Sequence, residues 1–190
     1  AISYGLLLAL LGFYGAQGFA RSRDWQDPVR IYLTTLKGNP KSYRAANNLG
    51  AEYFRKGRPA DAKAAFEASL RANPAYHPAL NNIGAVVEAE GRLSEALQWY
   101  LRSADSRPDY ALAHKNAAGI WLKLGKPSET EKEARAALEA HPRYADALNL
   151  LAASLFEQGR KSEALDPLLR SAALAPKPQT YLNLSILYSS

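Results

Sequence analysis

Asparagine side chains recur at a regular spacing along this sequence, and their amides could bind the backbone of a peptide. Asparagine is a poor residue for the interior of a helix, because its side chain competes for backbone hydrogen bonds. The amide both donates and accepts hydrogen bonds, so it can pair with an extended peptide whatever the side chains of that peptide are. The asparagines stand in four groups spaced 34 residues apart, and in the third group a lysine takes the first position. The groups are Asn47 with Asn48, Asn81 with Asn82, Lys115 with Asn116, and Asn149.

These groups belong to a repeat that runs through most of the chain. The segment NNLGAEYFRKGRPADAKAAFEASLRANP begins at Asn47, and NNIGAVVEAEGRLSEALQWYLRSADSRP begins at Asn81, with two further copies after them. Glycine and proline keep the same 34-residue period: Gly57, Gly91, Gly125 and Gly159, then Pro74, Pro108, Pro142 and Pro176. Such a period in four copies indicates a repeat architecture.

Each repeat has the pattern of two helices. The first ends at the glycine, which can adopt the left-handed conformation of a helix C-cap. Ser94, Ser128 and Ser162 stand where the second helix begins, so we expect them to cap it. Ser128 with Glu131 matches a capping box. The second helix ends near the proline, which cannot continue it.

Small residues recur where helices must cross closely, and large residues fill the space between them. The small positions on the first helices are Gly50, Gly84, Ala118 and Ala152, and the large positions are Phe66, Tyr100 and Leu168. One helix pair cannot bury its apolar face alone, whereas stacked pairs bury a continuous core. The sequence therefore predicts an all-α solenoid.

This pattern resembles the tetratricopeptide repeat family, on Leu49, Gly50, Tyr53, Ala62, Phe66 and Pro74 of the first repeat and their equivalents in the next three. The resemblance implies a right-handed solenoid of four units within residues 43–176: 43–76, 77–110, 111–144 and 145–176. Three residues depart from the family pattern: Thr130 replaces a small alanine, Ala134 replaces an aromatic, and Pro167 falls inside a second helix. Pro167 either kinks that helix or makes it start late, with Asp166 as its cap.

In this family the first helices line an inner groove, which implies that the asparagine face of each first helix lies there. The candidate groove residues are Arg44, Asn47, Asn48, Asn81, Asn82, Lys115, Asn116 and Asn149. A resemblance to the superhelical repeats of O-GlcNAc transferase implies that Asn48, Asn82 and Asn116 bind the backbone of a peptide or protein ligand. The alternative is that the asparagines only bridge adjacent repeats and bind no ligand.

Both ends of the repeat region have the pattern of half units. Residues 27–40 have the shape of a second helix, with Asp27 as cap and Pro28 in the first turn, and they lie in a junction of residues 21–42. Residues 180–190 match a first helix without its second. We therefore expect residues 177–190 to form a C-terminal capping helix.

Residues 1–20 carry no charge, and Arg21 and Arg23 follow them directly. Twenty helical residues at about 1.5 Å each span about 30 Å, the thickness of a bilayer core. Small residues four apart let helices approach closely, and they stand at Gly5, Ala9, Gly12, Ala16 and Ala20. The segment predicts a hydrophobic N-terminal helix that anchors the chain in a membrane or packs against copies of itself in a homo-oligomer or polymer.

The junction carries a second resemblance. An apolar helix, then RSRDW, then a half unit ending in NP is similar to the C-terminal part of membrane glycosyltransferases that carry tetratricopeptide repeats. That resemblance implies a region that binds the acceptor protein outside the cytoplasm. Helices bundled in a homopolymer would instead be similar in architecture to pilin-like filaments. We therefore expect a membrane-associated or extracellular protein, outside the cytoplasm of a bacterium. The sequence starts at Ala1 and contains no Met, so we expect either that an initiator or leader has been removed or that the chain is a fragment of a longer protein.

The composition argues against several functions. The net charge of +6 is spread along the chain without a run of like charges, which indicates a solvated surface rather than nucleic-acid binding. Groove charges are mixed, which does not favour a clamp for an acidic tail. There is no cysteine, and His77, His114 and His141 lie in separate repeats without metal-ligand spacing. The sequence predicts a non-enzymatic scaffold for protein–protein interaction, without cofactor or metal.

Overall fold

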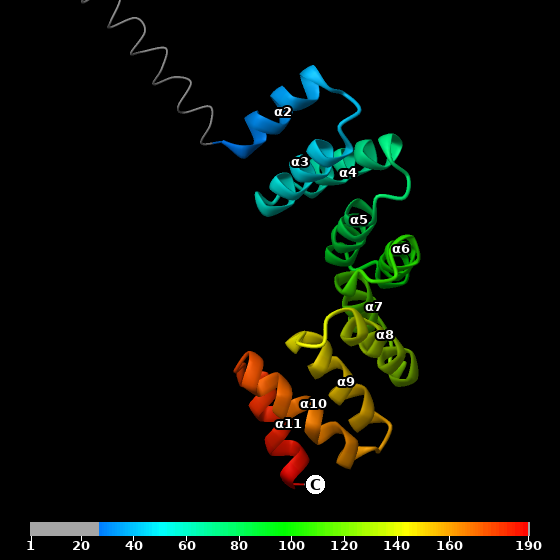
Figure 1. The fold of residues 1–190 in the computed structure, drawn as a ribbon, viewed down its shortest axis with the longest axis vertical. Helices are drawn as coiled ribbons and strands as arrows, with labels where there is room; N and C mark the ends of the chain where they lie inside the picture. The colour runs from blue at the N-terminus through cyan, green and yellow to red at the C-terminus, as the bar shows by residue number, and fades with distance from the viewer. Residues whose placement is uncertain (1–26, 190) are drawn as a thin grey trace, which may run out of the picture. The chain divides into compact units, whose positions relative to one another are not determined.

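The computed structural model describes residues 27–189, whereas residues 1–26 and 190 lie outside the described part of the chain. The predicted hydrophobic helix of residues 1–20 is therefore outside it. The described residues form helices and no strand, which confirms an all-α helical-repeat solenoid (Figure 1). The helices are α2 (Pro28–Gly38), α3 (Tyr43–Arg55), α4 (Pro59–Ala72), α5 (His77–Ala89), α6 (Leu93–Ser106), α7 (Ala111–Lys123), α8 (Pro127–Ala140), α9 (Ala145–Glu157), α10 (Lys161–Leu174) and α11 (Pro178–Ser189).

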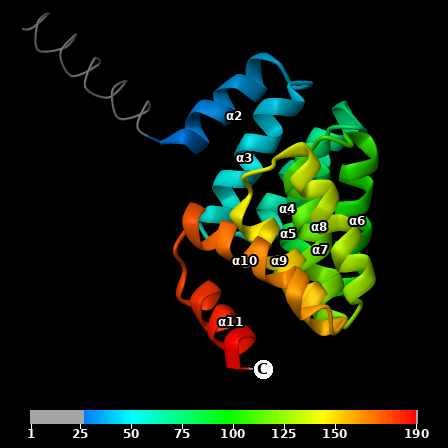
Figure 2. The same cartoon turned by 60° about the horizontal axis from the view of Figure 1, so that its bottom comes forward.

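The chain divides into two compact units between residues 73 and 74. In the N-terminal unit, α2 packs on α3 and α3 packs on α4. In the C-terminal unit, α5 packs on α6, α7 on α8 and α9 on α10, and α7 also contacts α9 (Figure 2). Helix α11 packs on α10, where the capping helix of residues 177–190 is predicted. In both compact units, consecutive helices therefore pack together as pairs.

The predicted glycine caps are confirmed. The φ angles of Gly57, Gly91, Gly125 and Gly159 lie between 65° and 79°, and no other described residue has a positive φ. In one of these turns the N–H of Arg92 donates to the carbonyl of Val87 at 3.2 Å, which gives a carbonyl in the last turn of α5 a hydrogen-bond donor. The predicted cap at Asp27 is present as well, since Oδ1 of Asp27 accepts from the N–H of Val29 at 3.2 Å and caps α2.

The predicted serine caps of the second helices are wrong. These helices begin one residue before Ser94, Ser128 and Ser162, and their cap residues make no side-chain cap hydrogen bond. An acidic residue in the first turn of each helix interacts favourably with the free N–H groups instead. In α10 that residue is Glu163, which pairs with Arg160 at 2.6 Å.

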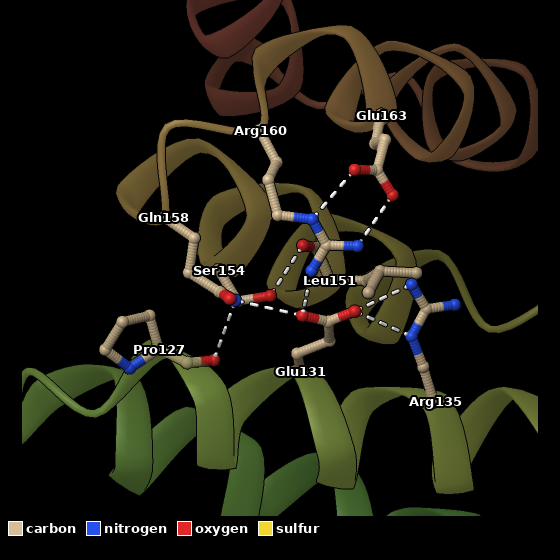
Figure 3. A network of polar contacts seen from close by, with 8 residues as sticks. All are labelled: Pro127, Glu131, Arg135, Leu151, Ser154, Gln158, Arg160 and Glu163. Carbon is tan, nitrogen blue, oxygen red and sulfur yellow. Dashed lines mark hydrogen bonds and ion pairs between the residues drawn. The ribbon is translucent and has the colours of Figure 1, made fainter.

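The predicted capping box of Ser128 and Glu131 is also wrong, because Glu131 is the centre of a network that joins α8 to the turn between α9 and α10 (Figure 3). Its carboxylate accepts from Arg135 at 2.7 Å, Arg160 at 2.6 Å and Gln158 at 2.9 Å. Burial opposes the charge of Glu131, but the hydrogen bonds from Gln158 and Arg135 outweigh burial and lower its pKa. The network holds one helix pair against the next.

Pro167 lies inside a continuous α10, so the late start with Asp166 as cap is wrong. Asp166 forms an exposed pair with Arg170 at 3.4 Å. Pro167 itself is buried, so its ring adds apolar contact area where the helix lacks one N–H donor.

The close crossing of the two helices in a pair is confirmed at the glycines. A Cβ on Gly50 would lie 2.6 Å from the ring of Phe66, and a Cβ on Gly84 would lie 2.7 Å from the ring of Tyr100. In the third pair, where Ala134 takes the place of the ring, the first helix carries Ala118, and both alanines are buried. Residue sizes on the two helices are thus matched.

We expect Gly84→Ala to lower the free energy of unfolding by about 1–2 kcal/mol, although alanine favours a helix by about 1 kcal/mol, because the added methyl overpacks Tyr100. Gly119→Ala on the next first helix is the matched control, since nothing lies within 4 Å of its added Cβ. It should raise the unfolding free energy by about 0.5–1 kcal/mol. Urea unfolding followed by circular dichroism measures both, and equal effects of the two substitutions would contradict the close crossing.

Serines on the second helices make a contact that the sequence analysis missed. Ser103 on α6 donates to the carbonyl of His77 at 2.8 Å, and Ser171 on α10 donates to that of Ala145 at 3.0 Å. Ser69 does the same to Tyr43 in the N-terminal unit. All three serines are fully buried, and their period of 34 residues was the available signal.

Candidate functional site

The first helices α5, α7 and α9 of the C-terminal unit surround a polar cavity of about 380 Å³. It is lined by Glu88, Lys115, Asn116, Gly119, Asp146, Asn149 and Leu150. Gly119 contributes space, because nothing would lie within 4 Å of a side chain there. The cavity therefore brings together three of the predicted groove residues, one lysine and two asparagines.

Asn116 is held in place by the buried Asn81 of the preceding pair. Its Nδ2 donates to Oδ1 of Asn81 at 2.9 Å, which bridges α7 and α5. The alternative that asparagines bridge adjacent repeats thus applies to this bond. Within residues 27–189, Oδ1 of Asn116 has no hydrogen-bond partner, and it remains available as an acceptor at the cavity.

Asn149 is positioned from the other side by α11. Its Oδ1 accepts from the hydroxyl of Thr180 at 3.2 Å. That bond leaves its Nδ2 as a donor without a partner in the described part of the chain. The cavity therefore offers one amide acceptor from α7 and one amide donor from α9.

The carboxylates of the cavity are already paired with lysines. Glu88 accepts from Lys123 at 2.6 Å and from the hydroxyl of Tyr100 at 2.7 Å, and Asp146 pairs with Lys177. Burial opposes the charge of Glu88, but the hydrogen bonds from Lys123 and Tyr100 outweigh it and lower the pKa of Glu88. Its charge is therefore fixed at neutral pH.

Lys115 forms no ion pair with any described residue, although it lies at the same cavity. Burial lowers the pKa of its amine, whereas the more distant carboxylates of Asp146 and Glu88 oppose that shift. The ammonium group is thus partly shielded from water and lacks a partner. A partly desolvated cation of this kind gains most from an anionic ligand.

Not every predicted groove residue reaches the cavity. Asn47 and Asn81 are only 6% and 3% exposed, so their amides present little surface to a ligand. Neighbouring helical residues lie about 100° apart around the axis, so only one of each pair can face outward. Asn82 is half-buried and does not line the cavity. Arg44 and Asn48 are exposed on α3 of the N-terminal unit, where Asn48 accepts from Asn47 at 3.3 Å.

A second, smaller cavity of about 130 Å³ lies on the same helix α9, toward α10 and α11. It is lined by Ala152, Ala153, Phe156, Glu157, Leu168 and Asn183. Its walls are mostly apolar, in contrast to the first cavity. This cavity could not be predicted from the sequence, because it forms where side chains of α9, α10 and α11 meet.

The described residues contain no cluster of His, Asp or Glu side chains that could hold a metal ion. Among the helices described here, none is both long enough and apolar enough to cross a membrane. The linings of the two cavities offer hydrogen-bonding groups, charged groups and apolar surface.

The stacked helix pairs and the polar cavity on the first helices define a class: helical-repeat scaffolds typical of protein–protein interaction. The model of the tetratricopeptide repeat family matches residues 48–111 and 116–179. The chain belongs to the tetratricopeptide repeat family. No curated protein matches the sequence significantly.

Solved structures with the same fold have low sequence identity to this chain. The structure of pilF from Pseudomonas aeruginosa is 18% identical, with a TM-score of 0.78, and the match covers 93% of this chain and 80% of that one. YrrB, described as a tetratricopeptide repeat protein with an unusual peptide-binding site, is 20% identical, with a TM-score of 0.64 over 93% and 87%. MamA from Desulfovibrio magneticus is 17% identical, with a TM-score of 0.68 over 76% and 82%. These likenesses show the fold alone.

Proposed function

We propose that this protein is a non-enzymatic scaffold that binds an extended peptide segment of a partner protein across α5, α7 and α9. The observation that carries the proposal is the convergence of three groups on one cavity: the amine of Lys115, the amide oxygen of Asn116 and the amide nitrogen of Asn149. A peptide backbone offers a donor and an acceptor at every residue, so it matches the two amides whatever its side chains are.

The amides are set before a ligand arrives. Asn81 holds Asn116, and Thr180 holds Asn149, so binding does not have to order these side chains. Pre-organisation of this kind raises affinity because less rotamer entropy is lost. The peptide-binding site named for YrrB, which shares the fold, supports the proposal that such a solenoid binds peptides.

Selection from a random dodecapeptide display library tests the proposal on the full chain. We expect selected peptides to bind the double variant Asn116→Leu, Asn149→Leu at least about 30-fold more weakly, because two hydrogen bonds of about 1 kcal/mol each are lost and the cavity is narrowed. Fluorescence anisotropy measures the affinity. Lys132→Ala, at an exposed position of α8, is the control and should change it less than twofold. Unchanged binding by the double variant would refute this site.

We also propose that residues 1–20 tether the scaffold, in a membrane or to copies of itself. Their lack of charge and their small residues four apart support both forms. A membrane tether also fits the acceptor-binding role outside the cytoplasm that the junction implies. Electron microscopy with and without residues 1–20 separates the two: filaments that vanish on deletion indicate a structural subunit, and single particles that need detergent until the deletion indicate an anchor.

A further inference from the structure

The polar cavity and the smaller apolar cavity are both lined by residues of α9. We propose that the groove selects an extended peptide that carries an acidic side chain and, four residues away, an aliphatic side chain. The acidic side chain occupies the polar cavity at Lys115, and the aliphatic one occupies the cavity at Ala153. This inference rests on the proposed peptide-binding function and specifies its ligand.

The preference for an acidic side chain follows from the charge balance of the polar cavity. Three ammonium groups, those of Lys115, Lys123 and Lys177, face two carboxylates, those of Glu88 and Asp146, which leaves one positive charge. Lys123 and Lys177 are each bound to one carboxylate, so the excess is located at Lys115. A basic side chain of the peptide would have to displace Lys123 or Lys177 from its carboxylate, whereas an acidic side chain can form an ion pair with the ammonium group of Lys115.

The preference for an aliphatic side chain follows from the walls of the second cavity. Ala152 and Ala153 leave its space open, and Phe156 and Leu168 give it apolar walls. Its volume of about 130 Å³ suits one aliphatic side chain. Glu157 lies at the same cavity and disfavours a second acidic side chain there.

The spacing follows from the helix that the cavities share. Residues 149 and 150 line the first cavity, and residues 152, 153, 156 and 157 line the second, on one face of α9. Their mean positions differ by about five residues, or about 7.5 Å along the helix axis. The first cavity lies toward α7 and the second toward α11, which adds about 10 Å, one helix-to-helix distance, across that axis. The two offsets together separate the cavities by about 12.5 Å, which about four residues of extended chain span, and side chains i and i+4 of such a chain point the same way.

Dodecapeptides selected by display on the full chain test the motif. We expect an Asp or Glu and a Leu, Ile or Val four positions apart to be enriched. Lys115→Met should weaken binding of these peptides at least about tenfold, but should change binding of their Gln counterparts less than about twofold. Ala153→Leu, which fills the second cavity, should weaken binding about tenfold only when the peptide carries the aliphatic residue. Lys132→Met is the control for both.

The outcomes separate this inference from the proposed function. Peptides that need Asn116 and Asn149 but show no acidic or aliphatic preference would overturn the motif and leave the peptide-binding function standing. Peptides whose binding ignores all four residues would overturn both. A preference at another spacing would overturn the arrangement of the motif across α9.

Discussion

Glu133→Ala is expected to lower the free energy of unfolding of the C-terminal unit by about 3 kcal/mol, because it removes one partner of a buried ion pair. The side chain of Glu133 is 9% exposed, and its Oε2 lies 2.7 Å from Nδ1 of His114. Nε2 of His114 lies 3.0 Å from the carbonyl oxygen of Pro108. A carboxylate and a carbonyl oxygen both only accept, so this geometry selects the doubly protonated imidazolium.

The same pair makes stability depend on pH. The hydrogen bond to Glu133 raises the pKa of His114 against the opposing effect of burial, and Asp105 raises it further. A base whose pKa is raised by folding contributes stability that is complete below its unfolded pKa of 6.5 and is lost as the pH rises through the folded pKa. The opposite holds for His77, since burial lowers its pKa and its contribution is lost as the pH falls.

Urea unfolding measures the stability loss of Glu133→Ala, and its comparison at about pH 6 and about pH 9 measures the pH dependence that His114 causes. The difference in unfolding free energy between wild type and His114→Gln should shrink as the pH rises, and His77 cancels because both proteins contain it. Glu139→Ala, at an exposed position of α8, is the control and should change stability by less than about 0.5 kcal/mol. A difference that stays constant with pH would show that His114 is not charged in the folded protein.

Tyr100→Ala is expected to cost about 4 kcal/mol, the range of a large aromatic removed from a core. Tyr100 is 1% exposed, and its ring lies against Gly84. Because Gly84 has no side chain, it cannot fill the cavity that the substitution leaves. Its hydroxyl donates to Glu88 at 2.7 Å, which connects the core to the polar cavity.

Tyr100→Phe separates the hydroxyl from the ring. It should cost only about 1–2 kcal/mol, because one charge-assisted hydrogen bond is lost and the ring is kept. Tyr181→Ala is the control, since Tyr181 is 54% exposed and should contribute less than about 0.5 kcal/mol. Urea unfolding followed by circular dichroism compares the three variants. Equal losses for the alanine and phenylalanine variants would mean that ring packing contributes nothing.

The order of helices and turns could be predicted from the sequence because it depends on local chemistry. A glycine at the same place in each repeat is needed where φ is positive, as at Gly91, and a proline ends each period. The match of Gly84 with Tyr100 was also visible, since small and large residues recur at fixed positions. The predicted serine caps are wrong because each of these second helices begins one residue before its serine, which puts the serine inside the helix. Acidic residues in the first turn, such as Glu163, interact with the free N–H groups of the helix start instead.

The sequence by itself determined the repeat, the helix pairs and the polar first-helix face, because each follows from residue spacing within about 34 positions. Only the tertiary structure decided which charges of that face are free. Glu88 on α5 pairs with Lys123 on α7, and Asp146 on α9 pairs with Lys177 in the connection between α10 and α11. Lys115 alone among these lysines is left without a carboxylate in the described part of the chain. That choice depends on how neighbouring helices rotate and stack, since a small rotation about a helix axis exchanges the side chains that face the groove for those that face the core.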